Sequence, residues 1–175
     1  MKLLEKMIIR KATCDDLEDI ANLELECFPV NEAATVHDFK ERLRVYPNHF
    51  LLLFLDDKLV AFVDGFCTCD ADLTDDMYEN SCLHDEDGDW QMIFGLNTHP
   101  DYRGQGYASK LMNCFIGQAR REKRLGVVLT CKKQMAEFYS KFGFVDEGIS
   151  ESAHGGAVWK QMRLTFDGVE GCKKY

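Results

Sequence analysis

Hydrophobic and polar residues follow two periods along the chain, and these periods predict its strands and helices. Short runs rich in β-branched and aromatic residues, bounded by turn residues, are typical of strands. Such runs predict seven strands, at Met7–Arg10, Phe50–Leu55, Leu59–Phe66, Trp90–Leu96, Val127–Thr130, Phe144–Glu147 and Val158–Thr165. Asp56-Asp57-Lys58 between the second and third runs predicts a hairpin.

Two signals of the form Thr-x-x-Asp, which is typical of helix starts, occur early in the chain. Thr13–Asp16 precedes residues with helical spacing that end near Cys27, and Thr35–Asp38 precedes Phe39 and Leu43 on one face. Further helices are expected over Gln134–Phe142 and after Pro100, where Ala108, Leu111, Met112, Phe115 and Ala119 recur every three or four residues.

The resulting order, β-α-α-β-β-β-α-β-α-β-β, predicts an α/β (α+β) fold with a mixed sheet and helices on both faces. A length of 175 residues fits one domain. We expect that domain over residues 7–166, with residues 167–175 as a poorly packed tail.

The acidic residues are unevenly distributed. Nine of them, and no Lys or Arg, lie between Asp70 and Asp89, so this segment alone accounts for the net charge of -9. We expect it to form a long loop or a broken helix. It either attracts cationic substrates or is a solvated insertion that aids solubility.

Composition excludes several classes of function. An acidic chain without a basic cluster does not suit nucleic-acid binding. The best apolar run, Phe50–Leu55, is too short to cross a membrane, and Met1–Met7 does not resemble a secretory signal. The eight cysteines are scattered without a Cys-x-x-Cys pair, so we expect reduced thiols, no metal and a cytoplasmic location.

The candidate chemistry lies in the run from Leu96 to Ser109, where a strand ends, a turn follows and glycines open a long helix. Unpaired N–H groups and the helix dipole make such a helix start an anion site, and glycines let a phosphate approach the backbone. The run is neither of two well-known phosphate loops. Ser109 stands where the dinucleotide fingerprint requires its third glycine, and the Gly-Lys-Ser/Thr of nucleotide-triphosphate loops is absent. A tight helix start that needs glycine only for packing remains the alternative.

The wider context resembles a known family. Arg103-x-x-Gly106-x-Ala108 matches the coenzyme A signature of the Gcn5-related N-acetyltransferase superfamily, and Phe138-Tyr139-x-x-Phe142-Gly143-Phe144 resembles its second hallmark. The resemblance covers roughly Ile8 to Phe166. It implies acetyl-CoA as co-substrate and a mixed, mostly antiparallel sheet that splays between its fourth and fifth strands.

The resemblance also implies roles for individual residues. The backbone of Leu96, Asn97 and Thr98 would hold pantetheine, Arg103 would shape the turn, and Thr130 would lie near the acyl and amine groups. The amides from Gly104 to Ser109 would hold the pyrophosphate; these residues are Gly104, Gln105, Gly106, Tyr107, Ala108 and Ser109.

Tyr139 matches the tyrosine near the coenzyme's sulfur in this family. The reaction needs an acid there, because a neutral amine attacks the thioester and the departing thiolate takes up a proton. A phenol with a pKa of about 10 is protonated at neutral pH and can supply that proton. A core aromatic residue beside Phe138 and Phe142 is the alternative, and the motif favours the catalytic role.

A second resemblance is to arylalkylamine (serotonin-type) N-acetyltransferases, notably non-vertebrate members. It rests on Cys27-Phe-Pro with Glu32-Ala-Ala, on Leu59-Val-Ala-Phe with Gly65, on Leu73-Thr74 and on Thr130-Cys131. It implies that Phe28, Pro29 and Glu32 lie near the amine pocket.

The chain departs from that family at the general base. Vertebrate members have two histidines on the fourth strand, where this sequence has Met92 and Phe94. Either water removes the amine's proton, or a group elsewhere does so. Candidates are His84, Asp87, Asp89, His154 and Glu32.

We therefore expect an N-acetyltransferase that acts on a small primary amine, arylalkylamine-like, by direct attack, as a monomer or homodimer without nucleic-acid or membrane partners. Cys131 has no histidine beside it in sequence, which disfavours a covalent acyl-enzyme. The alternatives are acetylation of a polyamine, amino acid or peptide N-terminus, and a non-catalytic acyl-CoA-binding module.

Overall fold

The computed structural model describes residues 5–169, which form two compact units. Within the described residues, the first unit contains 5–64 and 95–115, and the second contains 65–94 and 116–169. Each unit is built around its own sheet. The last six residues of the expected tail lie outside the described part of the chain.

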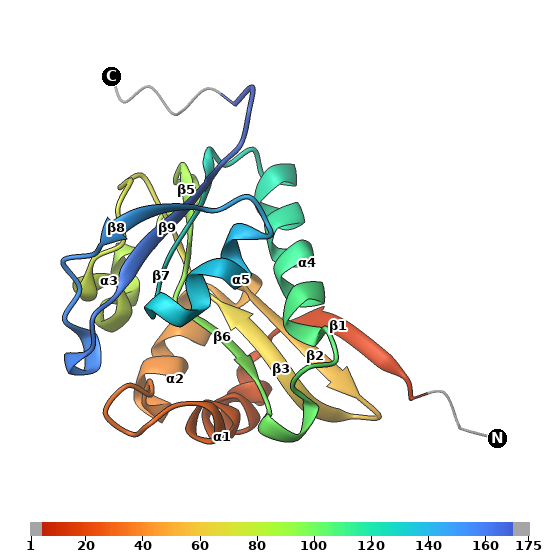
Figure 1. The fold of residues 1–175 in the computed structure, drawn as a ribbon. Coiled ribbons are helices and arrows are strands. Elements are labelled where there is room, and N and C mark those ends of the chain that lie inside the picture. Colours follow the sequence, from red (N-terminus) through yellow and green to blue (C-terminus); the bar gives the residue numbers. More distant parts are fainter. Residues whose placement is uncertain (1–4, 170–175) are drawn as a thin grey trace. The chain divides into compact units, whose positions relative to one another are not determined.

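The first unit has a four-stranded antiparallel sheet in the order β1-β2-β3-β6 (Figure 1). Its strands are β1 (Met7–Lys11), β2 (Phe50–Leu55), β3 (Lys58–Asp64) and β6 (Gly95–Thr98). Asp56 and Asp57 join β2 to β3 with φ angles of 44° and 69°, and such positive angles are typical of a two-residue hairpin turn. The predicted hairpin is confirmed.

Helices α1 (Leu17–Cys27) and α2 (Val36–Val45) belong to the first unit, where α1 packs on β3 and β6 and also contacts α2 (Figure 1). The predicted start of α2 is confirmed by a capping box, in which the amide of Asp38 donates to Thr35 Oγ1 at 3.1 Å and the Thr35 amide donates to Asp38. Phe39 of α2 meets Phe62 of β3 edge to face, with ring centroids 5.9 Å apart. Packing of these rings against the sheet builds the core of the unit.

The second unit has a five-stranded sheet in the order β4-β5-β7-β9-β8. Among the strand pairs of this sheet within residues 5–169, only β5–β7 is parallel, so the sheet is mostly antiparallel, as expected. Its strands are β4 (Cys67–Thr68), β5 (Trp90–Ile93), β7 (Gly126–Cys131), β8 (Val145–Ile149) and β9 (Lys160–Thr165). The short helix α5 (Ala136–Ser140) packs against β8 and β9.

Helix α4 (Tyr107–Arg121) begins in the first unit and ends in the second. Its predicted apolar face is confirmed, since Leu111, Met112, Phe115 and Ala119 are all buried. Arg120 and Arg121 lie in its last turn, where positive charge suits the helix dipole.

The mixed α/β fold is confirmed, but one expected strand is wrong in detail. The strand predicted over Trp90–Leu96 is interrupted at Phe94, so that β5 belongs to one sheet and β6 to the other. The sequence predicted one continuous strand because apolar residues occur on both sides of the break. Hydrophobicity alone does not reveal that the two parts pair with different strands. The strand predicted to end at Phe66 ends at Asp64.

The acidic segment is a broken helix, which was one of the two alternatives. It contains α3 (Asp75–Glu79) and a 3₁₀ turn over Ser81–Leu83.

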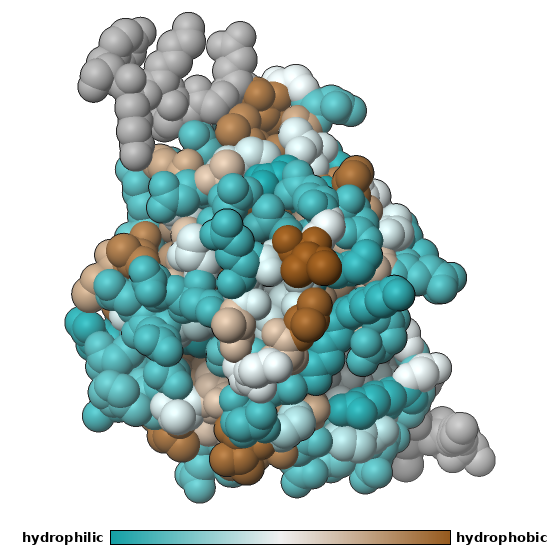
Figure 2. All heavy atoms as spheres, turned by 60° about the vertical axis from the view of Figure 1, so that its left-hand side comes forward, coloured by the Kyte–Doolittle hydropathy of each residue, from teal (hydrophilic) through white to brown (hydrophobic). Residues whose placement is uncertain are grey.

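Figure 2 shows one mainly hydrophilic face of the molecule, on which hydrophobic side chains gather only in small separate groups. Across residues 5–169, no helix combines the length and apolar character needed to span a bilayer.

Candidate functional site

The glycine turn, which we define as residues 103–106, connects the end of β6 and a short 3₁₀ turn to the start of α4. Gly104 and Gly106 have φ angles of +76° and +84°, in the left-handed region that side chains strain to adopt. Apart from each glycine and its chain neighbours, no atom of the described residues lies within 4 Å of where a Cβ would stand at either glycine. The glycines are therefore needed for the path of the backbone, and the space beside them is open.

The amides of residues 104–109 find no acceptor within the part of the chain that the structure describes. Among the described residues, no hydrogen bond leads from the backbone N–H groups of residues 104–109 to another part of the chain, and the helical pattern begins with Lys110 N–H donating to Gly106 at 3.1 Å. Ser109, Tyr107 and Ala108 are only partly exposed, whereas Gln105 is exposed. Unpaired donors at the positive end of a 15-residue helix make an anion site.

Arg103 fixes the entrance to the turn. Its Nε donates to the carbonyl oxygen of Thr98 at 3.0 Å, so the side chain folds back onto the end of β6. The same carbonyl accepts from Cys27 Sγ at 3.3 Å. Burial raises the pKa of the Cys27 thiol, against the opposing effect of Arg103, and this thiol therefore acts as a protonated donor.

Strand β6 presents its backbone while its central side chain is buried. Asn97 is 1% exposed, and its Nδ2 donates to Glu24 Oε2 at 2.6 Å. The second carboxylate oxygen of Glu24 accepts from the amide of Ala34 at 3.0 Å. Leu96 and Thr98 flank Asn97 and are half-buried. A single carboxylate thus ties α1 both to the expected pantetheine strand and to the loop that follows α1.

That loop carries the three residues expected near the amine. The amide of Phe28 donates to the backbone carbonyl oxygen of Glu24 at 3.0 Å and closes α1. The carbonyl oxygen of Pro29 accepts from the amides of Glu32 at 2.8 Å and Ala33 at 2.9 Å. The loop is therefore an ordered turn. The structure brings it together with Leu96–Thr98 and the glycine turn inside the first unit.

Tyr139 and Thr130, the other two expected site residues, belong to the second unit. Tyr139 lies on α5 and is 8% exposed. Burial, assisted by the neighbouring Cys131 and Tyr78, raises the pKa of its hydroxyl, so this group stays protonated at neutral pH. Its ring meets Phe138 and Phe144 edge to face, which fixes its orientation.

Sequence reasoning missed a group of aromatic residues around Thr130. Tyr78 from α3 shares a hydrogen bond of 2.9 Å with Thr130 Oγ1. Its ring stacks on His154 with centroids 5.2 Å apart and is tilted against Phe94 at 4.9 Å. We call Tyr78, Phe94 and His154 the ring cluster. The residues are far apart in the sequence, and the only available signal was an aromatic residue within an otherwise acidic segment.

Neither of the two positions at which related enzymes have a histidine as general base has a basic side chain in this protein. Met92 is fully buried on β5, and Phe94 interrupts the strand. His84 is already engaged, since Nδ1 accepts from the amide of Cys67 at 3.1 Å and Nε2 lies 2.9 Å from Glu86. Burial raises the pKa of Cys131 to about 11, which leaves its thiol protonated and a poor nucleophile.

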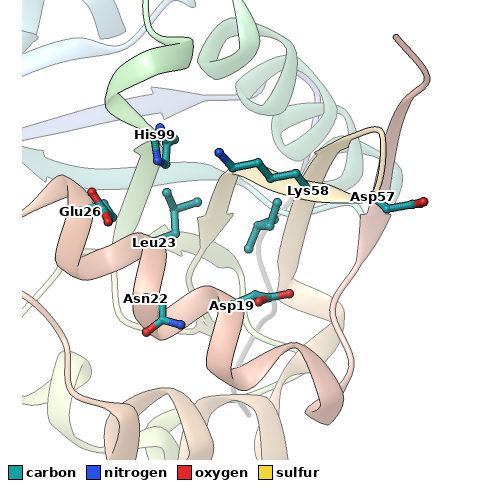
Figure 3. A pocket seen from close by; sticks show the side chains of 8 residues that line it. Asp19, Asn22, Leu23, Glu26, Asp57, Lys58 and His99 are labelled. Atoms are coloured by element: carbon teal, nitrogen blue, oxygen red, sulfur yellow. The ribbon is translucent and has the colours of Figure 1, made fainter.

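A hollow of about 360 Å³ lies in the first unit (Figure 3). Lys58 and His99 lie on one side of it, and α1 lines the other with Asp19, Asn22, Leu23 and Glu26 (Figure 3). His99 Nδ1 accepts from the amide of Asp101 at 3.2 Å, so His99 caps the 3₁₀ turn. None of the expected coenzyme or amine residues lines this hollow.

Solved structures that share this fold include the following three. The loading GNATL domain of CurA from Lyngbya majuscula has a TM-score of 0.78 at 16% identity, with 91% of this chain and 98% of that chain covered. The GphF GNAT-like decarboxylase in complex with isobutyryl-CoA has a TM-score of 0.77 at 21% identity, with coverage of 90% and 98%. The PaiA N-acetyltransferase from Thermoplasma acidophilum in complex with coenzyme A has a TM-score of 0.69 at 16% identity, with coverage of 92% and 99%.

At these identities the structural likeness establishes the GNAT fold. The sequence carries the assignment further, because the model of the acetyltransferase (GNAT) family matches residues 17–144, which is more than half of the chain. The chain therefore belongs to the acetyltransferase (GNAT) family.

Proposed function

We propose that this protein transfers the acetyl group of acetyl-CoA to a small primary amine, with an arylalkylamine as the preferred class. The observation that carries the proposal is the glycine turn, with two left-handed glycines, open space beside them and unpaired amides at the start of α4. Membership of the GNAT family and fold relatives bound to isobutyryl-CoA and coenzyme A support an acyl-CoA ligand.

The amides of residues 104–109 would bind the pyrophosphate, as their lack of protein acceptors allows. The backbone of Leu96, Asn97 and Thr98 would pair with the amide groups of pantetheine. The hydrogen bond from the Asn97 side chain to Glu24 would hold this part of β6 in place for the ligand. Arg103 would keep the turn open in the absence of coenzyme through its hydrogen bond to Thr98.

The chemistry would proceed by direct attack. The nitrogen of the neutral amine bonds to the thioester carbonyl carbon, the C–S bond breaks, and the thiolate takes the proton of the Tyr139 hydroxyl. The nitrogen then loses its extra proton to solvent, and Tyr139 regains one. Burial keeps the Tyr139 hydroxyl protonated before each turnover, as a proton donor must be, and the same rise in its pKa makes it a weaker acid than a free phenol. The raised pKa of Cys131 supports direct attack over a cysteine acyl-enzyme.

The arylalkylamine class is supported by the sequence resemblance around Cys27–Ala34 and Thr130, and by the aromatic residues around Thr130. Phe28, Pro29 and Glu32 would contribute to the amine site from an ordered loop.

Met92 and Phe94 stand where related enzymes have a base, and this substitution affects how kcat/KM for the amine depends on pH. A primary alkylamine has a pKa near that of lysine, about 10.4, and only its neutral form attacks. If solvent removes the proton, kcat/KM for the amine should rise about tenfold per pH unit between pH 6 and 9. An enzyme base that titrates near neutrality would flatten the profile within that range.

The test measures thiol release from acetyl-CoA with tryptamine, phenethylamine, spermidine and a peptide N-terminus, and confirms the acetylated product by mass spectrometry. Transfer to an amine frees the coenzyme thiol, whereas decarboxylation of an acyl-CoA leaves the thioester intact. Thiol release that depends on an arylalkylamine supports the proposal. Tight coenzyme binding without release for any amine would reject it in favour of a binding module.

A further inference from the structure

The acidic segment is attached to the loop that precedes β9 by hydrogen bonds. Asp75, at the start of α3, accepts from the backbone amide of Ala153 at 3.0 Å and from the Ser152 hydroxyl. The other side of that loop is held by Trp159, whose Nε1 donates to the carbonyl oxygen of His154 at 2.8 Å. These contacts fix α3 and His154 relative to each other.

Between these anchors, Tyr78 is the central member of the ring cluster. Its hydroxyl is held by Thr130 at 2.9 Å, its ring stacks on His154 at an interplanar angle of 11°, and Phe94 is tilted against it at 43°. Phe94 in turn meets Phe66 edge to face, with centroids 4.9 Å apart. The position of the Tyr78 ring is therefore determined by a polar contact at its tip and by rings beside it.

Each member of the cluster is only half-buried, so each leaves surface that another molecule can contact. Aromatic rings interact through their quadrupoles in offset-stacked or edge-to-face geometries, which gives an aryl ligand an advantage over a saturated ring of the same size. Tyr78 also contributes to the raised pKa of the Tyr139 hydroxyl, after burial and Cys131, which links the cluster to the expected catalytic acid.

We propose that Tyr78 determines substrate specificity, and that the ring cluster of Tyr78, Phe94 and His154 is the surface that selects an aromatic side chain on the acceptor amine. The inference rests on the proposed function, which leaves the selecting residues unnamed. It gives the acidic segment a specific task, which is to bring one aromatic residue to Thr130.

The experiment compares phenethylamine with 2-cyclohexylethylamine, which has the same length and a ring of similar size without π electrons. We expect Tyr78→Leu to lower kcat/KM for phenethylamine about 3- to 10-fold, roughly the worth of one aromatic pair, and to leave 2-cyclohexylethylamine within about twofold. Tyr78→Phe should keep the preference for phenethylamine, because the ring remains. Glu79→Gln, an exposed neighbour on the same helix, is the matched control and should leave the ratio unchanged.

An equal loss for both amines in Tyr78→Leu would show a structural role and overturn the inference. If Tyr78→Leu does not fold, as judged by thermal unfolding, Phe94→Leu tests the same surface, and an unchanged ratio there has the same meaning. Calorimetric binding of the two amines in the presence of coenzyme A separates the inference from the proposed function. Preferential binding of phenethylamine that Tyr78→Leu abolishes, without turnover, would reject acetyl transfer and retain the inference.

Discussion

The glycine turn and the ring cluster offer binding surfaces of opposite kinds. The turn presents backbone amides, and its glycines have no side chains to contribute. The ring cluster consists entirely of side chains, drawn from α3, the break after β5 and the loop before β9. A backbone surface suits a constant ligand such as a pyrophosphate, whereas a side-chain surface can change from one relative to another without altering the fold.

The comparison predicts different responses to mutation. A substitution of Gly104 or Gly106 acts through backbone conformation and should alter coenzyme affinity. A substitution around Thr130 and Tyr139 should instead alter the chemical step or the choice of amine.

The largest expected effect is that of Tyr139→Phe. Removing the hydroxyl takes away the proton that the thiolate needs, while the ring keeps its contacts with Phe138 and Phe144. We expect kcat to fall about 10²- to 10⁴-fold with little change in KM for acetyl-CoA. Steady-state kinetics with each substrate varied will measure both values.

Full activity of Tyr139→Phe at every pH would contradict the acid role and favour the alternative of a core aromatic residue. Tyr107→Phe is a suitable control for the loss of a phenol hydroxyl, since the proposal uses Tyr107 only through its backbone amide.

The two regions also differ in how far the sequence predicted them. The turn is a continuous stretch, and a local motif contains all of its information: a strand end, glycines and a helix start. The ring cluster depends on pairings between distant segments, which periodicity does not encode. The break at Phe94 was hidden for the same reason, since apolar residues continue through it while the hydrogen-bonding partner changes from β7 to β3.

The second expected effect is on stability and concerns a buried charge beside β6, the strand that leads to the glycine turn. Asp64 ends β3 opposite Gly95 of β6, and its carboxylate accepts from Arg42 Nη1 at 2.9 Å. Burial raises the pKa of Asp64 from 3.8 to about 6 despite the favourable effect of Arg42. The folded state then binds more protons than the unfolded state between these values, so the contribution of Asp64 to stability falls as pH rises through that window.

Unfolding in urea at pH 4 to 7 will measure this contribution. The free energy of unfolding of the wild type, relative to Asp64→Asn, should fall by up to about 3 kcal/mol between pH 4 and 6 and then level off. A relative gain in wild-type stability over the same range would mean that attraction to Arg42 outweighs burial and that the pKa is lowered instead.

A smaller effect is expected for Gly106→Ala. The open space beside Gly106 accommodates a methyl group, so the cost arises from the left-handed backbone, at about 1–2 kcal/mol. If the turn relaxes to avoid this strain, KM for acetyl-CoA should rise about 5- to 30-fold at nearly constant kcat. Gly168→Ala is the control, because Gly168 has a φ of +76° and open surroundings but lies far along the chain from the turn. An equal rise in KM in both variants would show a general loss of stability.

The smallest expected effect concerns the charge of the acidic segment. Asp72 and Glu86 are already paired with Arg163 at 2.6 Å and Arg124 at 3.7 Å, so they contribute little to a long-range field. Asp70, Asp76 and Asp87 are exposed, and we change all three to Asn. If the segment attracts cationic amines, kcat/KM for phenethylamine should fall about twofold at low ionic strength, because fewer cations are drawn towards the site.

The sign of the change for the second substrate separates attraction from damage. Acetyl-CoA is an anion that the same field repels, so its kcat/KM should rise in the triple variant while that of the amine falls. Both shifts should disappear at 1 M salt, where the Debye length shrinks to about 3 Å. A variant that lost activity with both substrates at every salt concentration would have a structural defect, and one that lost none would leave the segment with the task of presenting Tyr78.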